Sequence, residues 1–311
     1  MMTNSFLGLG PHGFHRIAYT EWGDGDHPHA VICVHGLTRN ARDFDWLAQS
    51  LQRSCRVACM DVVGRGESDW LAHKSDYTFR QYQSDAGALI ARITANRNRS
   101  GLSRWLHPRV AAPGSPSVDW VGTSMGGLIG MLVAAQPGSP IRRLVLNDVG
   151  PFIPWPALIR LKGYLGSRSR YESLDEVERW LRQACAEWGP MSDDQWKHLA
   201  THSAQPLDDG GYRLSFDPAV GAATAWGWDP DAKLGNRGLL GLELWSVWEA
   251  ISCPVLVLRG AESSVLPPET VARMRDRGPP VEVIELRGVG HAPSLMQDEQ
   301  IEAVRRFLLA K

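Results

Sequence analysis

A serine between two glycines, at the end of an apolar run, constrains the fold of this chain more than any other feature. Residues 121–127, with the sequence VGTSMGG, follow a strand-like segment and precede a helix-like one. A G-x-S-x-G sequence at such a junction holds the serine in a strained turn, and the glycines let the chain turn tightly enough to expose its hydroxyl. We therefore expect a nucleophile elbow with Ser124 at its tip, followed by a helix that Gly127 allows to lie close to the strand.

Strand-like and helix-like segments alternate along the chain, which predicts a mostly parallel sheet. The expected strands are residues 16–22, 30–34, 56–61, 117–121, 143–147, 254–258 and 281–286, and the expected helices are residues 42–51, 82–93, 125–135, 268–276 and 298–309. Ligands bind at the carboxyl ends of the strands in open α/β sheets. Each of the motifs considered below falls at such an end, so they are expected to converge on one site.

Three motifs besides the elbow follow strand ends. They are HGLTRN at residues 35–40, DVVGRGES at residues 61–68, and RGVGHAP at residues 287–293, which places His291 in a loop. With the elbow, and with a chain order of serine, acid and histidine, the sequence resembles the α/β-hydrolase family. The resemblance covers nearly the whole chain. It implies an α/β-hydrolase fold, with a mostly parallel sheet flanked by helices and a helical cap inserted after the family's sixth strand.

This resemblance divides the chain into a core domain, residues 1–150 and 249–311, and a helical cap (lid), residues 151–248. Rigid aromatic rings pack a cap onto the sheet and also line an apolar pocket, so we expect most of the cap tryptophans to serve packing and two or three to line the pocket. The cap tryptophans are Trp155, Trp180, Trp188, Trp196, Trp226, Trp228, Trp245 and Trp248. The Arg-, Gly-, Ser- and Pro-rich residues 97–117 are expected to form a solvated surface loop rather than a site for a partner or phosphate.

The family's chemistry implies a role for each motif. The serine attacks an acyl carbonyl while the histidine takes its proton, which assigns Ser124 as nucleophile and His291 as general base. The resemblance also implies that the backbone amides of Leu37 and Met125 form the oxyanion hole. His35 is expected to hold the oxyanion loop by hydrogen bonds rather than to act in catalysis.

The acid of the triad is where the sequence departs from the family. After its seventh strand, the family places a catalytic Asp at positions that here hold Ser263 and Ser264. A serine hydroxyl orients an imidazole but does not stabilise imidazolium by charge. Asp148, at the end of the strand beside the nucleophile strand, is the favoured replacement, since some family members carry the acid there. Glu262 is the second candidate, and an Asx-type turn that starts the cap is the structural alternative for Asp148.

Composition excludes several other classes of function. The chain has 311 residues, a formal net charge of -1 and a pI of about 6.8, so no strongly basic face for nucleic acid or an anionic membrane is expected. The first thirty residues lack the apolar core of a signal peptide, and no run of about eighteen apolar residues occurs. We therefore expect no membrane association and a cytoplasmic location.

Metal and disulfide chemistry find little support. The five cysteines are odd in number and show no C-x-x-C spacing, and Cys33 and Cys253 are expected to be buried thiols. His198 and His202 are four residues apart on an expected helix. They lack the Glu of H-E-x-x-H and an evident third ligand, so an ordinary exposed pair is expected rather than zinc ligands.

Together these observations predict a serine hydrolase that cleaves a small-to-medium carboxylic ester or lactone through an acyl-enzyme, with neither metal nor organic cofactor. The expected partner is that small molecule, and a homo-oligomer is compatible with the sequence. Two alternatives stay open. A meta-cleavage carbon–carbon hydrolase shares the triad, and the missing seventh-strand acid suggests a catalytically weakened small-molecule-binding protein. Epoxide hydrolase and dehalogenase activity are disfavoured, because both need an aspartate where Ser124 stands.

Overall fold

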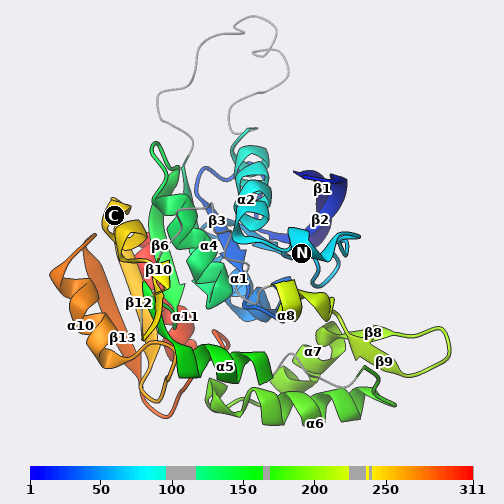
Figure 1. The fold of residues 1–311 in the computed structure, drawn as a ribbon. Helices are drawn as coiled ribbons and strands as arrows, with labels where there is room; N and C mark the ends of the chain where they lie inside the picture. Colours follow the sequence, from blue (N-terminus) through cyan, green and yellow to red (C-terminus); the bar gives the residue numbers. More distant parts are fainter. Residues whose placement is uncertain (96–116, 164–168, 224–235, 238–239, 311) are drawn as a thin grey trace, which may run out of the picture.

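The structure is a computed structural model that describes residues 1–95, 117–163, 169–223, 236–237 and 240–310 (Figure 1). Its centre is an eight-stranded sheet. The strand order is β1 (Met2–Gly10), β2 (Gly13–Trp22), β4 (Arg56–Met60), β3 (Ala30–Val34), β5 (Val118–Thr123), β6 (Ile141–Asn147), β12 (Val255–Gly260) and β13 (Val281–Leu286). β2 pairs antiparallel with both β1 and β4, and every pair from β4 to β13 is parallel.

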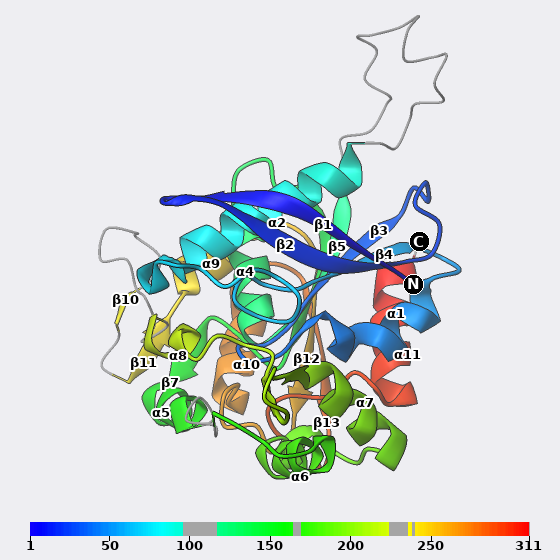
Figure 2. The same cartoon turned by 90° about the vertical axis from the view of Figure 1, so that its right-hand side faces the viewer.

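Helices cover both faces of this sheet (Figure 2). One face carries α2 (Phe79–Thr94) and α4 (Met125–Ala134), and the other carries α1 (Asp45–Leu51) and α11 (Asp298–Leu309). The other described helices of the core are η1 (Ala41–Phe44), η2 (Lys74–Asp76) and α10 (Pro268–Asp276). Among the described helices, none has the length and apolar content needed to cross a bilayer.

The central strands are buried on both faces, which explains their unbroken apolar sequences. All five residues of β3 are buried. Val31 and Cys33 pack with side chains of α1 and α11, while Ile32 and Val34 pack with side chains of α2 and α4. Successive side chains of a strand point to opposite faces, so a strand between two helical layers is apolar at every position.

Residues 151–248 lie between β6 and β12 in the sequence, and several of their described elements gather at one end of the sheet, in the lower part of Figure 1. Their elements are β7 (Phe152–Pro154), α5 (Trp155–Gly163), α6 (Leu174–Ala184), η4 (Ala186–Trp188), α7 (Asp193–Ser203), β8 (Ala204–Pro206), β9 (Tyr212–Leu214), α8 (Ala219–Ala223), β10 (Asn236–Arg237), β11 (Gly241–Glu243) and α9 (Trp245–Ala250). α9 crosses the expected domain boundary, and its Trp248 indole donates a hydrogen bond of 2.5 Å to the Arg277 carbonyl of the core.

The expected elements match the observed ones within a few residues, with two exceptions. β1 was not expected, because its sequence MTNSFLGLG is polar and glycine-rich; it is an edge strand that pairs along its whole length with β2. The expected helix at residues 42–51 is divided into η1 and α1, and the Asn40 side chain caps η1. The surface loop expected at residues 97–117 falls almost entirely outside the described residues, as do Trp226 and Trp228.

Candidate active site

Ser124 stands at the sharp turn between β5 and α4, with φ 52° and ψ -115°. A non-glycine residue rarely adopts a positive φ, so the turn is strained. A β-carbon on Gly122 would lie 2.3 Å from the Gly126 carbonyl oxygen, and one on Gly126 would lie 2.0 Å from the Val34 carbonyl oxygen. Both glycines are therefore required by close backbone contacts, as expected for a nucleophile elbow.

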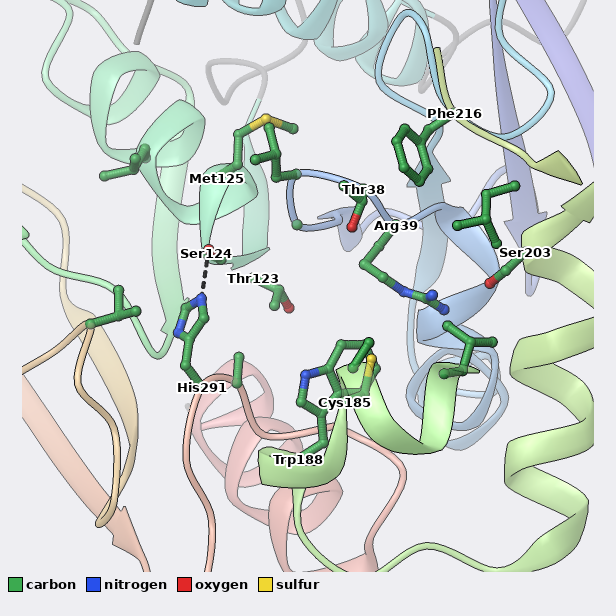
Figure 3. Close-up of a pocket in the computed structure, with 18 of the residues that line it drawn as sticks. Thr38, Arg39, Thr123, Ser124, Met125, Cys185, Trp188, Ser203, Phe216 and His291 are labelled. Carbon is green, nitrogen blue, oxygen red and sulfur yellow. Dashed lines mark hydrogen bonds between the residues drawn. The ribbon is translucent and has the colours of Figure 1, made fainter. Parts of the chain in front are cut away.

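The structure brings Ser124, His291 and Asp148 together. His291 Nε2 lies 2.9 Å from Ser124 Oγ (Figure 3), and His291 Nδ1 lies 2.8 Å from Asp148 Oδ2. A carboxylate can only accept, so Nδ1 carries the proton and Nε2 presents its lone pair to the serine hydroxyl. The Asp148 side chain is fully buried, and that of His291 is 7% exposed. This is the arrangement that a general base needs to deprotonate a nucleophile.

Asp148 has two further partners, one at the end of β12 and one in the loop that follows. Its Oδ1 accepts from the Gly260 N–H at 2.8 Å, and its Oδ2 accepts from the Ser263 hydroxyl at 2.5 Å. Ser263 Oγ in turn accepts from the N–H groups of Val265 and Leu266, so its own proton points to the carboxylate. Ser263 thus holds a candidate acid that follows the neighbouring strand, a contact that the sequence analysis missed.

The rival candidates for the acid lie elsewhere. Glu262 is exposed to solvent. Ser264 is also exposed, and its hydroxyl contacts the Arg160 guanidinium. The Asp148 carboxylate binds Gly260, Ser263 and His291 rather than the residues that follow it, so the Asx-type turn considered from the sequence does not form.

The loop after β3 faces the elbow. A β-carbon on Gly36 would lie 3.8 Å from Ser124 Cβ, so the backbone of this loop approaches the serine closely. Met125 is the first residue of α4, and its N–H therefore has no acceptor within the helix. Gly36, Leu37 and Met125 line the same pocket as Ser124.

The fully buried Arg65 contacts both the loop after β3 and the first residue of α4. Arg65 Nε donates to the Leu37 carbonyl at 2.9 Å, and Arg65 Nη2 lies 3.6 Å from Met125 Sδ. Its Nη1 donates to the Val63 carbonyl and to the Tyr82 hydroxyl. Arg65 lies in the glycine-rich motif after β4, whose function the sequence did not indicate.

His35 is buried beneath the loop that it precedes. Its Nδ1 lies 2.6 Å from the Gly36 carbonyl oxygen, and its Nε2 accepts from the Val62 N–H at 3.0 Å. Burial lowers the pKa of His35 to about 3, so the ring is neutral at neutral pH. These contacts agree with the structural role expected for His35.

The pocket above Ser124 has mostly apolar walls (Figure 3). Residues 151–248 contribute Trp180 and Trp188 to it, in line with the two or three tryptophans expected there. Of the other described tryptophans in this segment, Trp196, Trp245 and Trp248 are buried and Trp155 is half-buried. Arg39, which the sequence analysis did not single out, also lines the pocket.

The expectation of an exposed His198 and His202 pair is wrong. Both histidines are half-buried because α7 packs against η1, and His198 Nε2 donates to the Arg42 carbonyl at 3.0 Å. Burial and the nearby Arg42 lower the pKa of His202 to about 4. Asp45 is a third potential ligand, since its carboxylate oxygen and one nitrogen of each ring lie within 4.8 Å of one another, but the Arg42 guanidinium binds Asp45 and lies 3.2 Å from His202 Nδ1.

The five cysteines are buried free thiols, which confirms the expectation for Cys33 and Cys253. Burial raises the pKa of the Cys55 and Cys185 thiols to about 12, and that of Cys253 to about 11. These thiols are therefore protonated and inert at neutral pH.

Comparison with known proteins gives consistent matches. Residues 31–306 match the profile of the alpha/beta hydrolase family. A 3-hydroxybutyrate-oligomer hydrolase of Cupriavidus necator is 40% identical over 302 residues, covering 96% of this chain and 94% of that protein. A 2-(acetamidomethylene)succinate hydrolase of Mesorhizobium japonicum is 25% identical over 280 residues, covering 89% and 87%. The crystal structure of an alpha/beta hydrolase from Novosphingobium aromaticivorans superposes with a TM-score of 0.77 at 31% identity, covering 98% of each chain.

Proposed function

Because the chain belongs to the alpha/beta hydrolase family, we propose that it is a serine hydrolase that cleaves a small or medium carboxylic ester. The observation that carries this proposal is the continuous set of hydrogen bonds from Asp148 through His291 to Ser124, at the wall of an apolar pocket. A buried carboxylate, an oriented imidazole and a serine on a strained turn are the parts that acyl transfer needs.

The reaction follows from this geometry. Ser124 Oγ attacks the ester carbonyl while His291 Nε2 takes the hydroxyl proton, and the Asp148 carboxylate stabilises the imidazolium that forms. The N–H groups of Leu37 and Met125 bind the oxyanion of the tetrahedral intermediate. His291 then protonates the departing alcohol, and a water molecule that gives its proton to the same nitrogen releases the acid from the acyl-enzyme.

One relative favours an ester substrate of modest size. The protein that is 40% identical over nearly its whole length is described as acting on 3-hydroxybutyrate oligomers, which are short chains of ester-linked hydroxy acids. We propose the same substrate class here. Residues 151–248 are proposed to form the cap over the pocket, because α6 and η4 supply Trp180, Leu181 and Trp188 to its walls.

The two alternatives differ in their support. The binding-protein alternative rested on a missing acid, and the proposal that Asp148 supplies it is supported by the 2.8 Å contact between Asp148 Oδ2 and His291 Nδ1. A meta-cleavage carbon–carbon hydrolase would use the same three residues, so substrates must separate it from an ester hydrolase. We expect hydrolysis of 3-hydroxybutyrate dimer and 4-nitrophenyl butyrate, and none of a vinylogous diketone.

A fluorophosphonate probe tests the proposal directly. We expect one covalent adduct, located on Ser124 by mass spectrometry, and its loss in the Ser124→Ala variant. That variant should retain only about 10³- to 10⁴-fold acceleration over water, from the oxyanion hole and substrate binding. The exposed Ser264 provides a matched control, since Ser264→Ala should label as the wild type does. An adduct on another residue, or ester turnover without any adduct, would contradict the assignment.

A further inference from the structure

One charged side chain stands out in the otherwise apolar pocket. Arg39 belongs to the loop after β3, and its side chain is only 9% exposed. Its Cγ lies 3.9 Å from the point where a β-carbon on Gly36 would stand, a point that is also 3.8 Å from Ser124 Cβ. From there the side chain extends away from Ser124 to the opposite end of the pocket (Figure 3). The Arg39 side chain therefore leads away from the nucleophile and places its charge at the far end of the cavity.

The Arg39 guanidinium is held in place but not saturated. Asp43 accepts one hydrogen bond from Nε at 3.0 Å and one from Nη2 at 2.7 Å. The group has five N–H donors in a rigid fork, and within the described part of the chain no residue accepts from Nη1. Trp188 lies under the guanidinium, with Cζ 5.2 Å from the ring centroid. Unused donors on a fixed, buried cation are a prepared site for an anion.

A second polar group at this end of the pocket also lacks a partner. Ser203, the last residue of α7, is 4% exposed, and its Oγ makes no hydrogen bond with any described residue. Its hydroxyl faces the Arg39 guanidinium across the pocket (Figure 3). A buried hydroxyl that makes no hydrogen bond destabilises the folded protein, and a ligand that hydrogen-bonds to it removes this cost.

The rest of the pocket wall, as far as the structure describes it, offers no other site for a charged group of a substrate. Among its described lining residues, none is acidic, and Arg39 and His291 are the only ionisable side chains apart from the thiol of Cys185. The lining between the two ends includes Leu181, Leu214 and Phe216. A substrate that fits this distribution has its scissile ester at Ser124, an apolar spacer, and an anionic group at Arg39.

We propose that Arg39 and Ser203 form a carboxylate-binding subsite, so that the preferred substrates are esters that also carry a free carboxylate. The carboxylate would accept from Arg39 Nη1 and from the Ser203 hydroxyl, while Asp43 keeps the guanidinium in its orientation. The inference deepens the proposed function and rests on it only in placing the ester at Ser124. Binding at Arg39 is a separate property that can be measured without turnover.

The test compares the 3-hydroxybutyrate dimer with its C-terminal primary amide, which has the same shape but no charge. Binding of both is measured by titration calorimetry in the Ser124→Ala background, and kcat/KM for both is measured with Ser124 intact. We expect the acid to be favoured over the amide by on the order of 10²-fold in both measurements. Ser203→Ala should reduce this preference by about tenfold.

Variants at Arg39 must avoid leaving a buried, unpaired carboxylate. Arg39→Met combined with Asp43→Asn removes both charges and should abolish the preference for the acid. Arg39→Lys keeps the ion pair but loses the planar fork, and should reduce the preference about tenfold. The matched control is Arg42→Met with Asp45→Asn, a similar ion pair outside this pocket, which should leave the acid-to-amide ratio unchanged.

The possible outcomes separate the two proposals. Equal binding of acid and amide, or a preference that persists without Arg39, overturns the carboxylate subsite even if both compounds are hydrolysed. A preference that depends on Arg39 in the Ser124→Ala background supports the subsite even if the wild type cleaves neither compound, and that result would contradict the proposed function alone.

Discussion

At the scale of single residues, the site depends on a carboxylate and a hydroxyl from two neighbouring strands. Asp148 follows β6, whereas Ser263 follows β12, and their side chains meet at 2.5 Å beside His291. Ser263 stands where the family's acid is expected, yet it donates a hydrogen bond to Asp148, the residue proposed to replace that acid. A hydrogen bond to a buried charged group contributes about 1.5 to 3 kcal/mol, which is enough to affect catalysis.

We therefore predict graded effects at these two positions. Asp148→Asn should lower kcat by about 10³- to 10⁴-fold, because the amide favours the wrong imidazole tautomer. Ser263→Ala should lower kcat by roughly 10- to 100-fold with little change in KM, since the carboxylate keeps its bonds to Gly260 and His291. Ser264→Ala is the matched control and should keep the wild-type kcat. Steady-state kinetics on 4-nitrophenyl butyrate measure all three, and a wild-type kcat in Asp148→Asn would refute the assignment.

The sequence predicts some of these residues and not others, for a physical reason. Ser124 and His291 lie in short motifs with distinctive local backbone requirements, so both could be located without a structure. Asp148 could be predicted only through the resemblance to a family, because nothing in its local sequence distinguishes it from a turn residue. Ser263 and Arg39 were missed because their roles depend on contacts with side chains that only folding brings near, such as Asp148, which lies 115 residues from Ser263 in the chain.

At the scale of elements, Arg65 joins three separate segments behind the site. Its guanidinium contacts Leu37 in the loop after β3, Met125 at the start of α4, and Tyr82 in α2. These contacts fix the positions of the two residues whose N–H groups are proposed to bind the oxyanion. Small displacements of such donors weaken stabilisation of the transition state more than binding of the substrate.

We predict that Arg65→Lys lowers kcat by about tenfold or more and leaves KM nearly unchanged, because one ammonium group cannot reach all of these acceptors. Arg16, an exposed arginine of β2 paired with Asp69, serves as the control, and Arg16→Lys should keep the wild-type kcat. Kinetics are measured well below the thermal midpoint of each variant, so that unfolding does not contribute. A rise in KM at constant kcat would place Arg65 in substrate binding instead.

At the scale of the whole molecule, burial of neutral histidine makes the free energy of unfolding depend on pH. The pKa of His35 is lowered from 6.5 to about 3 by burial. Below pH 6.5 the unfolded chain therefore binds a proton at this position that the folded protein does not. The contribution to stability is complete above pH 6.5 and is lost as the pH falls, at up to about 1.4 kcal/mol per pH unit.

This dependence predicts a difference between the wild type and His35→Asn. At pH 7 the wild type should be the more stable protein, because Asn cannot reproduce both hydrogen bonds of the ring. The difference between the two free energies should narrow by roughly 2 kcal/mol between pH 7 and pH 5, since only the wild type loses this contribution. Urea unfolding at pH 7, 6 and 5 measures it. A constant difference across that range would show that His35 does not titrate in this way.

The position of Asp148 also has a consequence for how the chain can be divided. With the proposed acid after β6, residues 1–150 hold the proposed nucleophile, acid and oxyanion residues together with Arg39, while residues 249–311 supply His291 and the Gly260 and Ser263 donors that hold Asp148. A polypeptide cut within residues 151–248 would thus separate the proposed nucleophile and acid from a fragment that carries the imidazole and both donors to the acid. Hydrolysis would then return only when the two fragments reassemble, which makes this chain a natural candidate for a split reporter enzyme.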